Sequence, residues 1–196
     1  MITIRTMDLS ELARIGEINR SEEISQHYVC KDGSLHLKDA HWSVPPWAED
    51  GSGGHSVQGK IAEWRPWIEE GGTMFGAFDG DALAAFAIYR PRLSPGMAQF
   101  AVLHVSRPYR RQGLGARLAA EVIALAKHDN AKQLYVSSAP TRGTVEFYQS
   151  LGFHPAREIN QELLELEPED IHMTMELQES SDPTHDRRAE SASAEF

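Results

Sequence analysis

The stretch from Leu103 to Ala116 constrains the fold most, because an apolar strand pattern runs there into a glycine turn that opens a helix. Apolar residues then recur at helical spacing as far as Lys127. The first N–H groups of a helix lack intrahelical acceptors, and glycine lets an anion approach them closely. The turn itself consists of Arg110, Arg111, Gln112, Gly113, Leu114 and Gly115. It predicts an α/β protein with a pyrophosphate-type anion site where the strand meets the helix.

Two better-known phosphate motifs are excluded in this turn. A Walker loop needs Gly-Lys-Ser/Thr and a dinucleotide fingerprint needs Gly-x-Gly-x-x-Gly, and neither occurs. What remains is Arg-x-x-Gly-x-Gly after a strand, with Arg110 and Arg111 adding positive charge. The alternative is a glycine-rich helix start that only packs closely against the sheet.

The rest of the chain alternates strand and helix patterns, which favours a mixed α/β sheet with helices on both faces. Helices are expected over residues 8–20, 58–70, 113–127 and 141–150, and strands over 2–5, 73–78, 82–89, 98–105, 133–137, 153–158 and 171–177. Residues 24–57 contain prolines and a glycine cluster, so we expect a long irregular loop there. We expect one domain over residues 1–178 and an acidic, flexible tail over 179–196.

Composition narrows the class of protein. A chain of 196 residues with 41% apolar residues suits one globular domain, and no apolar run is long enough to cross a membrane. The net charge of −10 argues against a nucleic-acid partner and suits a cationic amine, although many enzyme surfaces are acidic. Cys30 is the single cysteine, and the histidines show no metal-ligand spacing, so neither a disulfide nor a metal is expected. A cytoplasmic location is the corresponding expectation.

A second sequence pattern, about 30 residues after the glycine turn, makes the interpretation of the turn more specific. Phe147 and Tyr148 are followed by Gly152 and Phe153, and a strand pattern separates them from the Arg110–Gly115 turn. The two patterns together resemble motifs A and B of the GNAT N-acetyltransferase superfamily, with motif support over residues 73–177 and architectural support over the first 72. The resemblance implies a mixed, mostly antiparallel sheet whose parallel strands splay at the cofactor site, with acetyl-CoA as co-substrate and no metal.

The resemblance also assigns roles to individual residues. Tyr148 is expected to protonate the departing thiolate, and a packing role is the alternative. The pantetheine arm would pair with the strand at Leu103–Val105, and the backbone N–H groups from Arg111 to Ala116 would hold the pyrophosphate. The implied cofactor contacts are Leu103, His104, Val105, Arg110, Arg111, Gln112, Gly113, Leu114, Gly115, Ala116, Thr141 and Tyr148.

The chain departs from the family pattern at two positions. Thr141 stands where many relatives have asparagine, and Gln99 stands near the position where some relatives have a glutamate base. The resemblance therefore does not identify the general base. His104 is a catalytic candidate because its ordinary pKa lies near 6.5, and a core histidine is the alternative. Further candidates, with solvent exposure as the alternative, are Glu22, Glu23, Asp39 and His41. Several aromatic residues are candidates for lining an acceptor pocket, and packing of the N-terminal segment onto the sheet is the alternative. They are Tyr28, Trp42, Trp47, Trp64 and Trp67.

The expected function is direct transfer of an acetyl group from acetyl-CoA to a primary amine, within a ternary complex. A small-molecule acceptor is favoured because residues 24–57 are bulky enough to cover the acceptor site. The alternatives are a protein or peptide acceptor, and a catalytically silent acyl-CoA-binding module. No nucleic acid or membrane is expected as a partner, and a homodimer is an option because dimers are common among the proteins that this chain resembles.

Overall fold

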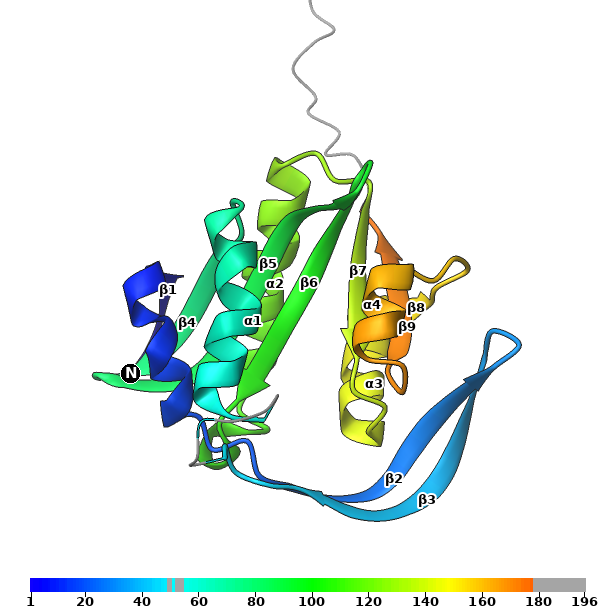
Figure 1. Cartoon of the computed structure of the whole chain (residues 1–196), viewed down its shortest axis with the longest axis horizontal. Helices are drawn as coiled ribbons and strands as arrows, with labels where there is room; N and C mark the ends of the chain where they lie inside the picture. Colours follow the sequence, from blue (N-terminus) through cyan, green and yellow to red (C-terminus); the bar gives the residue numbers. More distant parts are fainter. Residues whose placement is uncertain (49–50, 52–54, 178–196) are drawn as a thin grey trace, which may run out of the picture.

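A central sheet organises the part of the chain that the computed structural model describes, residues 1–48, 51 and 55–177 (Figure 1). Its strand order is β1-β4-β5-β6-β7-β9-β8, and a separate two-stranded ribbon is formed by β2 and β3. The strands of the central sheet are β1 (Ile2–Met7), β4 (Thr73–Asp79), β5 (Ala82–Ser94), β6 (Met97–Val105), β7 (Gln133–Ser138), β8 (His154–Pro155) and β9 (Ile171–Glu176). All neighbouring strands in this sheet are antiparallel except β6 and β7, as expected.

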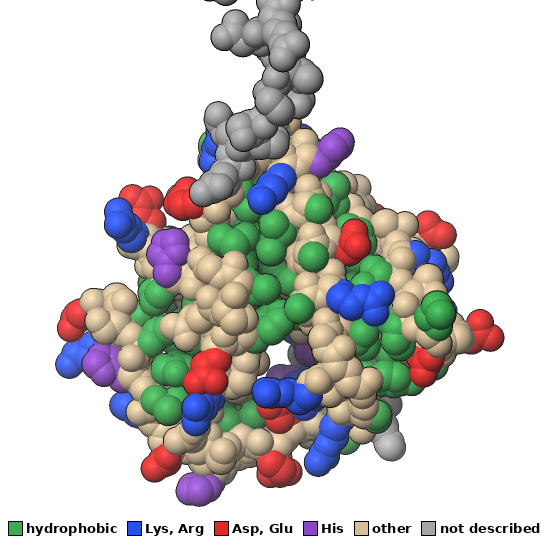
Figure 2. Space-filling view, turned by 180° about the vertical axis from the view of Figure 1, so that it is seen from behind, with side chains coloured by type: hydrophobic (Ala, Val, Ile, Leu, Met, Phe, Trp, Pro, Cys, Tyr) green, Lys and Arg blue, Asp and Glu red, His purple; other side chains and the backbone are tan. Residues whose placement is uncertain are grey.

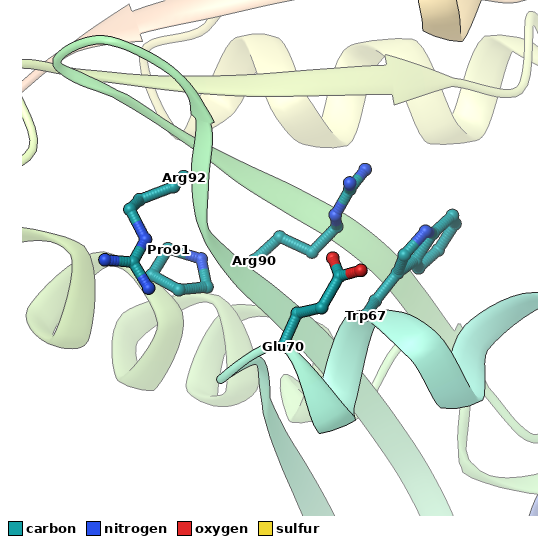
Figure 3. A pocket seen from close by; sticks show the side chains of 5 residues that line it. All are labelled: Trp67, Glu70, Arg90, Pro91 and Arg92. Atoms are coloured by element: carbon teal, nitrogen blue, oxygen red, sulfur yellow. The ribbon is translucent and has the colours of Figure 1, made fainter.

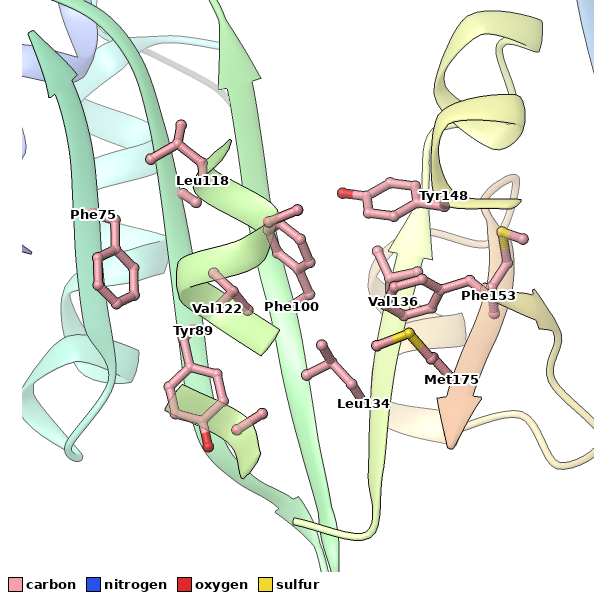
Figure 4. Close-up of a cluster of buried hydrophobic side chains, with 14 of the residues drawn as sticks. Phe75, Tyr89, Phe100, Leu118, Val122, Leu134, Val136, Tyr148, Phe153 and Met175 are labelled. Carbon is pink, nitrogen blue, oxygen red and sulfur yellow. The ribbon is translucent and has the colours of Figure 1, made fainter. Parts of the chain in front are cut away.

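Helices cover both faces of the sheet. The 3-10 helix η1 (Leu9–Glu17) and the helices α1 (Val57–Glu69) and α4 (Gln161–Leu166) lie on one face, and α2 (Leu114–His128) and α3 (Arg142–Ser150) lie on the other (Figure 1). Each face has its own buried apolar cluster. The cluster under α2 and α3 includes Phe100, Leu118 and Tyr148 (Figure 4), and the cluster under η1 and α1 includes Trp64 and Phe86.

The two parallel strands separate after a short contact. They pair only from Met97 to Gln99 on β6 and from Gln133 to Tyr135 on β7. Two residues beyond Gln99, β6 contains a bulge. Ile88 of β5 faces Val102 while Tyr89 faces Phe100, which leaves Ala101 without a partner on β5. A bulge bends its strand and increases the local twist. The rest of β6 therefore turns away from β7, which gives the splayed parallel strands that were expected.

The expectation of an irregular loop over residues 24–57 is wrong. Most of this stretch forms a long antiparallel ribbon of β2 (Glu22–Lys31) and β3 (Ser34–Val44). Asp32 and Gly33 make its turn with φ angles of 51° and 74°, as a two-residue Asp-Gly hairpin requires. Among the described ribbon residues, the buried apolar side chains are Ile24 and Ala40, so the sequence lacks the alternation that identifies a half-buried strand.

Three smaller differences from the expected helices and strands lie toward the two ends of the chain. The first helix is 3-10 rather than α, and the strand expected over residues 153–158 is limited to His154–Pro155. The polar connection before β9 contains α4, whose cap is the side chain of Asn160, which accepts from the Leu163 N–H at 3.1 Å. The predicted tail over residues 179–196 lies outside the described residues. No helix within the described ranges has the length and apolar character to cross a membrane.

Candidate active site

The glycine turn between β6 and α2 presents free backbone donors. Arg111 and Gly113 both have left-handed φ angles, 62° and 79°, and α2 begins at Leu114. The first N–H with a helical acceptor is that of Arg117, which donates to the Gly113 carbonyl at 3.1 Å. Within the described chain, the backbone N–H groups of residues 111–116 donate to no other residue. A Cβ at Gly113 would meet nothing within 4 Å, so the space beside these donors is open. This arrangement is suited to an anion.

Two neighbours fix the turn. The Gln112 side chain donates from Nε2 to the Pro108 carbonyl at 3.0 Å. A Cβ at Gly115 would lie 3.4 Å from the Phe147 ring of α3 and 3.7 Å from Val105. The alternative considered for these glycines, close packing, therefore describes Gly115, whereas Gly113 faces open space.

The Arg110 guanidinium is bound by other parts of the chain. Its guanidinium donates to the carbonyl oxygens of Val105, Ser21 and Arg20 at 3.1, 3.3 and 3.1 Å, and to the Glu22 carboxylate at 3.2 Å. These bonds fasten the start of the β2–β3 ribbon to the end of β6. Because its donors are occupied by the chain itself, the structure gives the Arg110 side chain a fastening role, and its contact with the cofactor stays a prediction. The Arg111 side chain is exposed beside the turn.

Tyr148 lies on α3 with its hydroxyl directed toward the gap between β6 and β7 (Figure 4). The ring is 4% exposed and meets Phe100 edge-on, with centroids 5.6 Å apart. Burial, together with the negative charge of Asp170, raises the pKa of Tyr148. No described residue forms a hydrogen bond with the hydroxyl. The phenol is therefore protonated across the neutral range, and its proton is free for a ligand.

Thr141 caps α3, since its side chain accepts from the Thr144 N–H at 3.3 Å. Its hydroxyl also lies 2.9 Å from the Thr144 hydroxyl, and its backbone bridges to His27 of the ribbon. The cap explains a threonine at this position. The cofactor contact at Thr141 stays a prediction.

His104 lies on the face of β6 that carries η1 and α1, whereas Leu103 and Val105 pack against the cluster under α2 and α3. Its ring is enclosed by aromatic neighbours, with centroids 5.5 Å from Phe86 and 5.7 Å from Trp47. Burial, with smaller contributions from nearby cations, lowers the pKa of His104 to about 3. Such a group is a poor acceptor for a proton from an alkylammonium of pKa about 10. This environment favours the alternative of a core histidine, and the catalytic role of His104 stays a prediction.

A different carboxylate occupies the same face. Asp170, in the turn between α4 and β9, accepts a hydrogen bond at 3.2 Å from the Ser137 hydroxyl at the end of β7. Burial, followed by the charge of Glu167 and a side-chain hydrogen bond with it, raises the pKa of Asp170 well above its ordinary value. Lys60 of α1 lies within electrostatic range of both Asp170 and His104. Asp170 was missed in the sequence because it is one of several acidic residues in a polar connection, without a spacing signal.

The other candidate bases lie on the ribbon. Glu22 is bound by Arg110, and Asp39 accepts from the Gln26 side chain at 3.3 Å. Glu23 and His41 line a shallow cavity of about 390 Å³. Glu23, Asp39 and His41 are exposed, as the alternative reading holds, and Glu22 forms an ion pair with Arg110.

The aromatic candidates divide between packing and surface. Trp64 is buried, and Trp47 donates from Nε1 to the Ile18 carbonyl at 2.9 Å. Trp42 is exposed, and the Tyr28 hydroxyl lies 3.4 Å from a carboxylate oxygen of Glu146. Trp67 stacks under the Arg90 guanidinium at 5.0 Å and borders a cavity of about 330 Å³ between α1 and β5 (Figure 3). Packing is thus the main role of the tryptophans near His104.

Seen from the side of α2 and α3, the surface is hollowed near its centre, and charged and histidine side chains gather there (Figure 2). Across the described ranges, no three His, Cys, Asp or Glu side chains are grouped to hold a metal ion. Gln99 is 2% exposed, and its side-chain oxygen accepts from Arg90 at 3.0 Å. The amide at this position therefore has a structural partner.

Known structures share this fold. A nourseothricin acetyltransferase has a TM-score of 0.66 at 14% identity, covering 90% of this chain and 99% of its own. A Bacillus anthracis protein assigned as a streptothricin acetyltransferase, solved with acetyl coenzyme A, has a TM-score of 0.66 at 15% identity, covering 91% and 98%. The ribosomal-protein-S18-alanine N-acetyltransferase of Escherichia coli has a TM-score of 0.55 at 19% identity, covering 93% and 97%.

At the level of sequence, no curated protein matches the chain significantly. The family model described as the acetyltransferase (GNAT) family matches residues 36–153, which is more than half of the chain and contains both the glycine turn and Tyr148. The chain therefore belongs to the acetyltransferase (GNAT) family.

Proposed function

We propose that this acyltransferase moves an acetyl group from its co-substrate acetyl-CoA to a primary amine of a small molecule, by direct attack in a ternary complex. One observation carries the proposal. The gap between β6 and β7 has free N–H donors at the glycine turn and the unpartnered Tyr148 hydroxyl directed toward it (Figure 4). A turn with free N–H groups and a buried tyrosine hydroxyl thus lie around one opening in the sheet, and this arrangement supports the proposal.

The cofactor would be held mainly by backbone groups. The N–H groups from Arg111 to Ala116 have no acceptor among the described residues and would bind the pyrophosphate, with Arg111 as the nearby charge. The part of β6 from Leu103 to Val105 has lost its β7 partner, so its free edge suits the amide groups of pantetheine. Backbone N–H groups on that edge would polarise the thioester carbonyl.

Tyr148 would act on the leaving sulfur. Its raised pKa keeps the phenol protonated, so a donor is present whenever the C–S bond breaks. The ring is packed among Phe100, Phe147 and Phe153, and these apolar surroundings would strengthen the hydrogen bond to the developing thiolate.

The ribbon favours a small acceptor over a peptide. At one end the Arg107 N–H donates to the Asn19 carbonyl at 2.9 Å, and further along the Tyr28 N–H donates to the Pro140 carbonyl at 2.7 Å. The ribbon therefore runs from the end of β6 to the loop after β7 and crosses the open end of the gap (Figure 1). A bound peptide would have to pass this crossing. The similarity in fold to the nourseothricin and streptothricin enzymes agrees with a small amine, and the S18 enzyme keeps a protein acceptor as the alternative.

A thiol-release assay with acetyl-CoA tests the proposal. The acceptors would be streptothricin antibiotics, polyamines, free amino acids and peptides, and calorimetry would measure acetyl-CoA affinity separately. Release with a small amine supports the proposal, and release with peptides alone supports the protein acceptor. Tight acetyl-CoA binding without release for any amine supports a catalytically silent module.

A further inference from the structure

We propose that Asp170 is the general base of this enzyme, taking a proton from the ammonium group of the acceptor on the face of the sheet that carries α1 and α4. The proposal rests on the proposed function, because it names the missing partner of Tyr148 in that reaction. Neither the glycine turn nor the Tyr148 position implies a base, and His104 is unsuited to the role.

The position of Asp170 follows from the divergence of the strands. Val136 of β7 packs into the cluster under α2 and α3, so its neighbour Ser137 faces the opposite side. Ser137 lies beyond Tyr135, the last β7 residue paired with β6, and its hydroxyl holds the Asp170 carboxylate at 3.2 Å. The carboxylate is therefore fixed beside the gap, on the face away from the glycine turn.

Asp170 and Tyr148 reach the gap from opposite faces of the sheet. They are close enough that the charge of Asp170 contributes to the raised pKa of Tyr148. An acyl transfer from sulfur to nitrogen needs a proton acceptor near the nitrogen and a proton donor near the sulfur, on either side of the carbonyl carbon. The two residues satisfy this requirement.

A second observation indicates that a polar ligand belongs here. His172 lies directly opposite Ser137 in the β7–β9 register and is 6% exposed. Both of its ring nitrogens are buried without a hydrogen-bond partner among the described residues. Buried polar atoms in folded proteins normally have partners, so an unpaired imidazole beside Asp170 points to a polar group that arrives with the acceptor.

The charges around Asp170 suit the chemistry. Burial and Glu167 raise its pKa, whereas the Ser137 hydroxyl and the Lys60 ammonium act in the opposite direction. With Tyr148, these are the charged and titratable groups that act on the carboxylate. A base whose pKa is closer to that of an alkylammonium removes its proton more effectively than an ordinary aspartate.

The protons balance in the resulting step. Asp170 takes one proton from the ammonium, and the neutral nitrogen attacks the thioester carbonyl, so that a C–N bond forms and the C–S bond breaks. Tyr148 gives its proton to the sulfur and regains one from the nitrogen, and the amide keeps the third. Asp170 then releases its proton to solvent, which leaves an amide, free CoA thiol and one proton.

The test compares Asp170→Asn with Glu169→Gln, which removes an exposed charge one residue away. Each variant is assayed with two acceptors. One is an alkylamine that is active with the wild type, a streptothricin or a polyamine, and the other is hydroxylamine, which is neutral at pH 7. We expect Asp170→Asn to lower kcat/KM for the alkylamine about 100-fold or more, with a much smaller loss for hydroxylamine. Acetyl-CoA affinity by calorimetry and the near-UV circular dichroism spectrum should stay unchanged, and Glu169→Gln should behave as the wild type.

Equal losses for the two amines, or activity of Asp170→Asn near that of the wild type, would overturn the base assignment while leaving the proposed function intact. A wild type that releases no thiol with any amine overturns the proposed function, and the role of Asp170 with it. If Asp170→Asn fails to fold, Asp170→Glu replaces it. Retention of the alkylamine reaction by Asp170→Glu, with an altered pH profile, supports the role, and an unaltered profile contradicts it.

Discussion

The hydroxyl of Ser137 donates a hydrogen bond of 3.2 Å to Oδ2 of Asp170, where β7 has already separated from β6. This bond joins the splayed strand to the turn before β9. It also stabilises the charged form of the carboxylate and so opposes the effects of burial and Glu167 on its pKa. Ser137 is thus a positioning residue for Asp170.

We predict that Ser137→Ala shifts the pH dependence of the reaction upward. In the wild type the base is active when deprotonated, so kcat/KM should rise with pH and level off above the raised pKa of Asp170. Removing the hydroxyl raises that pKa further because a hydrogen bond to the carboxylate is lost. The pH profile of thiol release measures the shift. A profile that moves to lower pH, or stays in place, contradicts the assigned hydrogen bond.

Asp170 should also make the folded state less stable as the pH rises. In the unfolded chain an aspartate releases its proton near pH 3.9, but the folded protein retains it to higher pH because burial and Glu167 raise the pKa of Asp170. The folded state therefore binds more protons between these values, and its stability falls as the pH increases through this window. Asp170→Asn removes the effect. Urea unfolding at pH 5 and pH 8.5 should show a smaller difference between the two conditions for the variant than for the wild type.

Tyr148→Phe separates catalysis from cofactor binding. The variant keeps the ring contacts with Phe100 and Phe153 but lacks the donor. We expect kcat to fall about 100-fold, within the usual range for a lost proton donor, with acetyl-CoA affinity unchanged. Thiol-release assays measure kcat, and calorimetry measures the affinity for acetyl-CoA. Unchanged turnover would leave Tyr148 with a packing role only.

The sequence predicts the helices and strands whose apolar residues recur at the spacing of the element, because their apolar side chains are the buried ones. The glycine turn, the strand before it and the α3 motif are each short-range patterns, and all are found near the expected residues. The ribbon was missed because both of its faces are largely exposed, although Asp32-Gly33 is a strong hairpin signal. The helix α4 was missed because Leu163 is its single buried apolar residue among the described ones.

The site was less predictable than the fold because it depends on contacts between distant segments. The sequence shows positive charge at Arg110 but not that Arg20, Ser21 and Glu22 lie beside it and bind its guanidinium. It likewise does not distinguish Asp170 from the other acids before β9. The pairing of β7 with β9 makes that distinction by bringing the turn next to Ser137.

Arg110 and Arg111 should therefore respond differently to removal of their charge. Arg110→Ala loses the bonds that tie the ribbon to β6, and we expect unfolding to become about 2 kcal/mol easier. Arg111→Ala should leave stability nearly unchanged and weaken acetyl-CoA binding, most clearly at low salt, because exposed charges are screened. Urea unfolding and calorimetry at two salt concentrations compare the pair. A reversed pattern would mean that Arg110 serves the cofactor.

Gly113 and Gly143 form a matched pair of helix-start glycines. Neither has a neighbour within 4 Å of a built Cβ, but Gly113 has a φ of +79° and borders the free N–H groups, whereas Gly143 lies in the first turn of α3. Gly113→Ala should cost about 1 kcal/mol of stability, because left-handed backbone disfavours a side chain, and should weaken acetyl-CoA binding by crowding the anion site. Gly143→Ala should be neutral or stabilising by up to about 1 kcal/mol. Equal acetyl-CoA affinities of the two variants by calorimetry would argue against the turn as the pyrophosphate site.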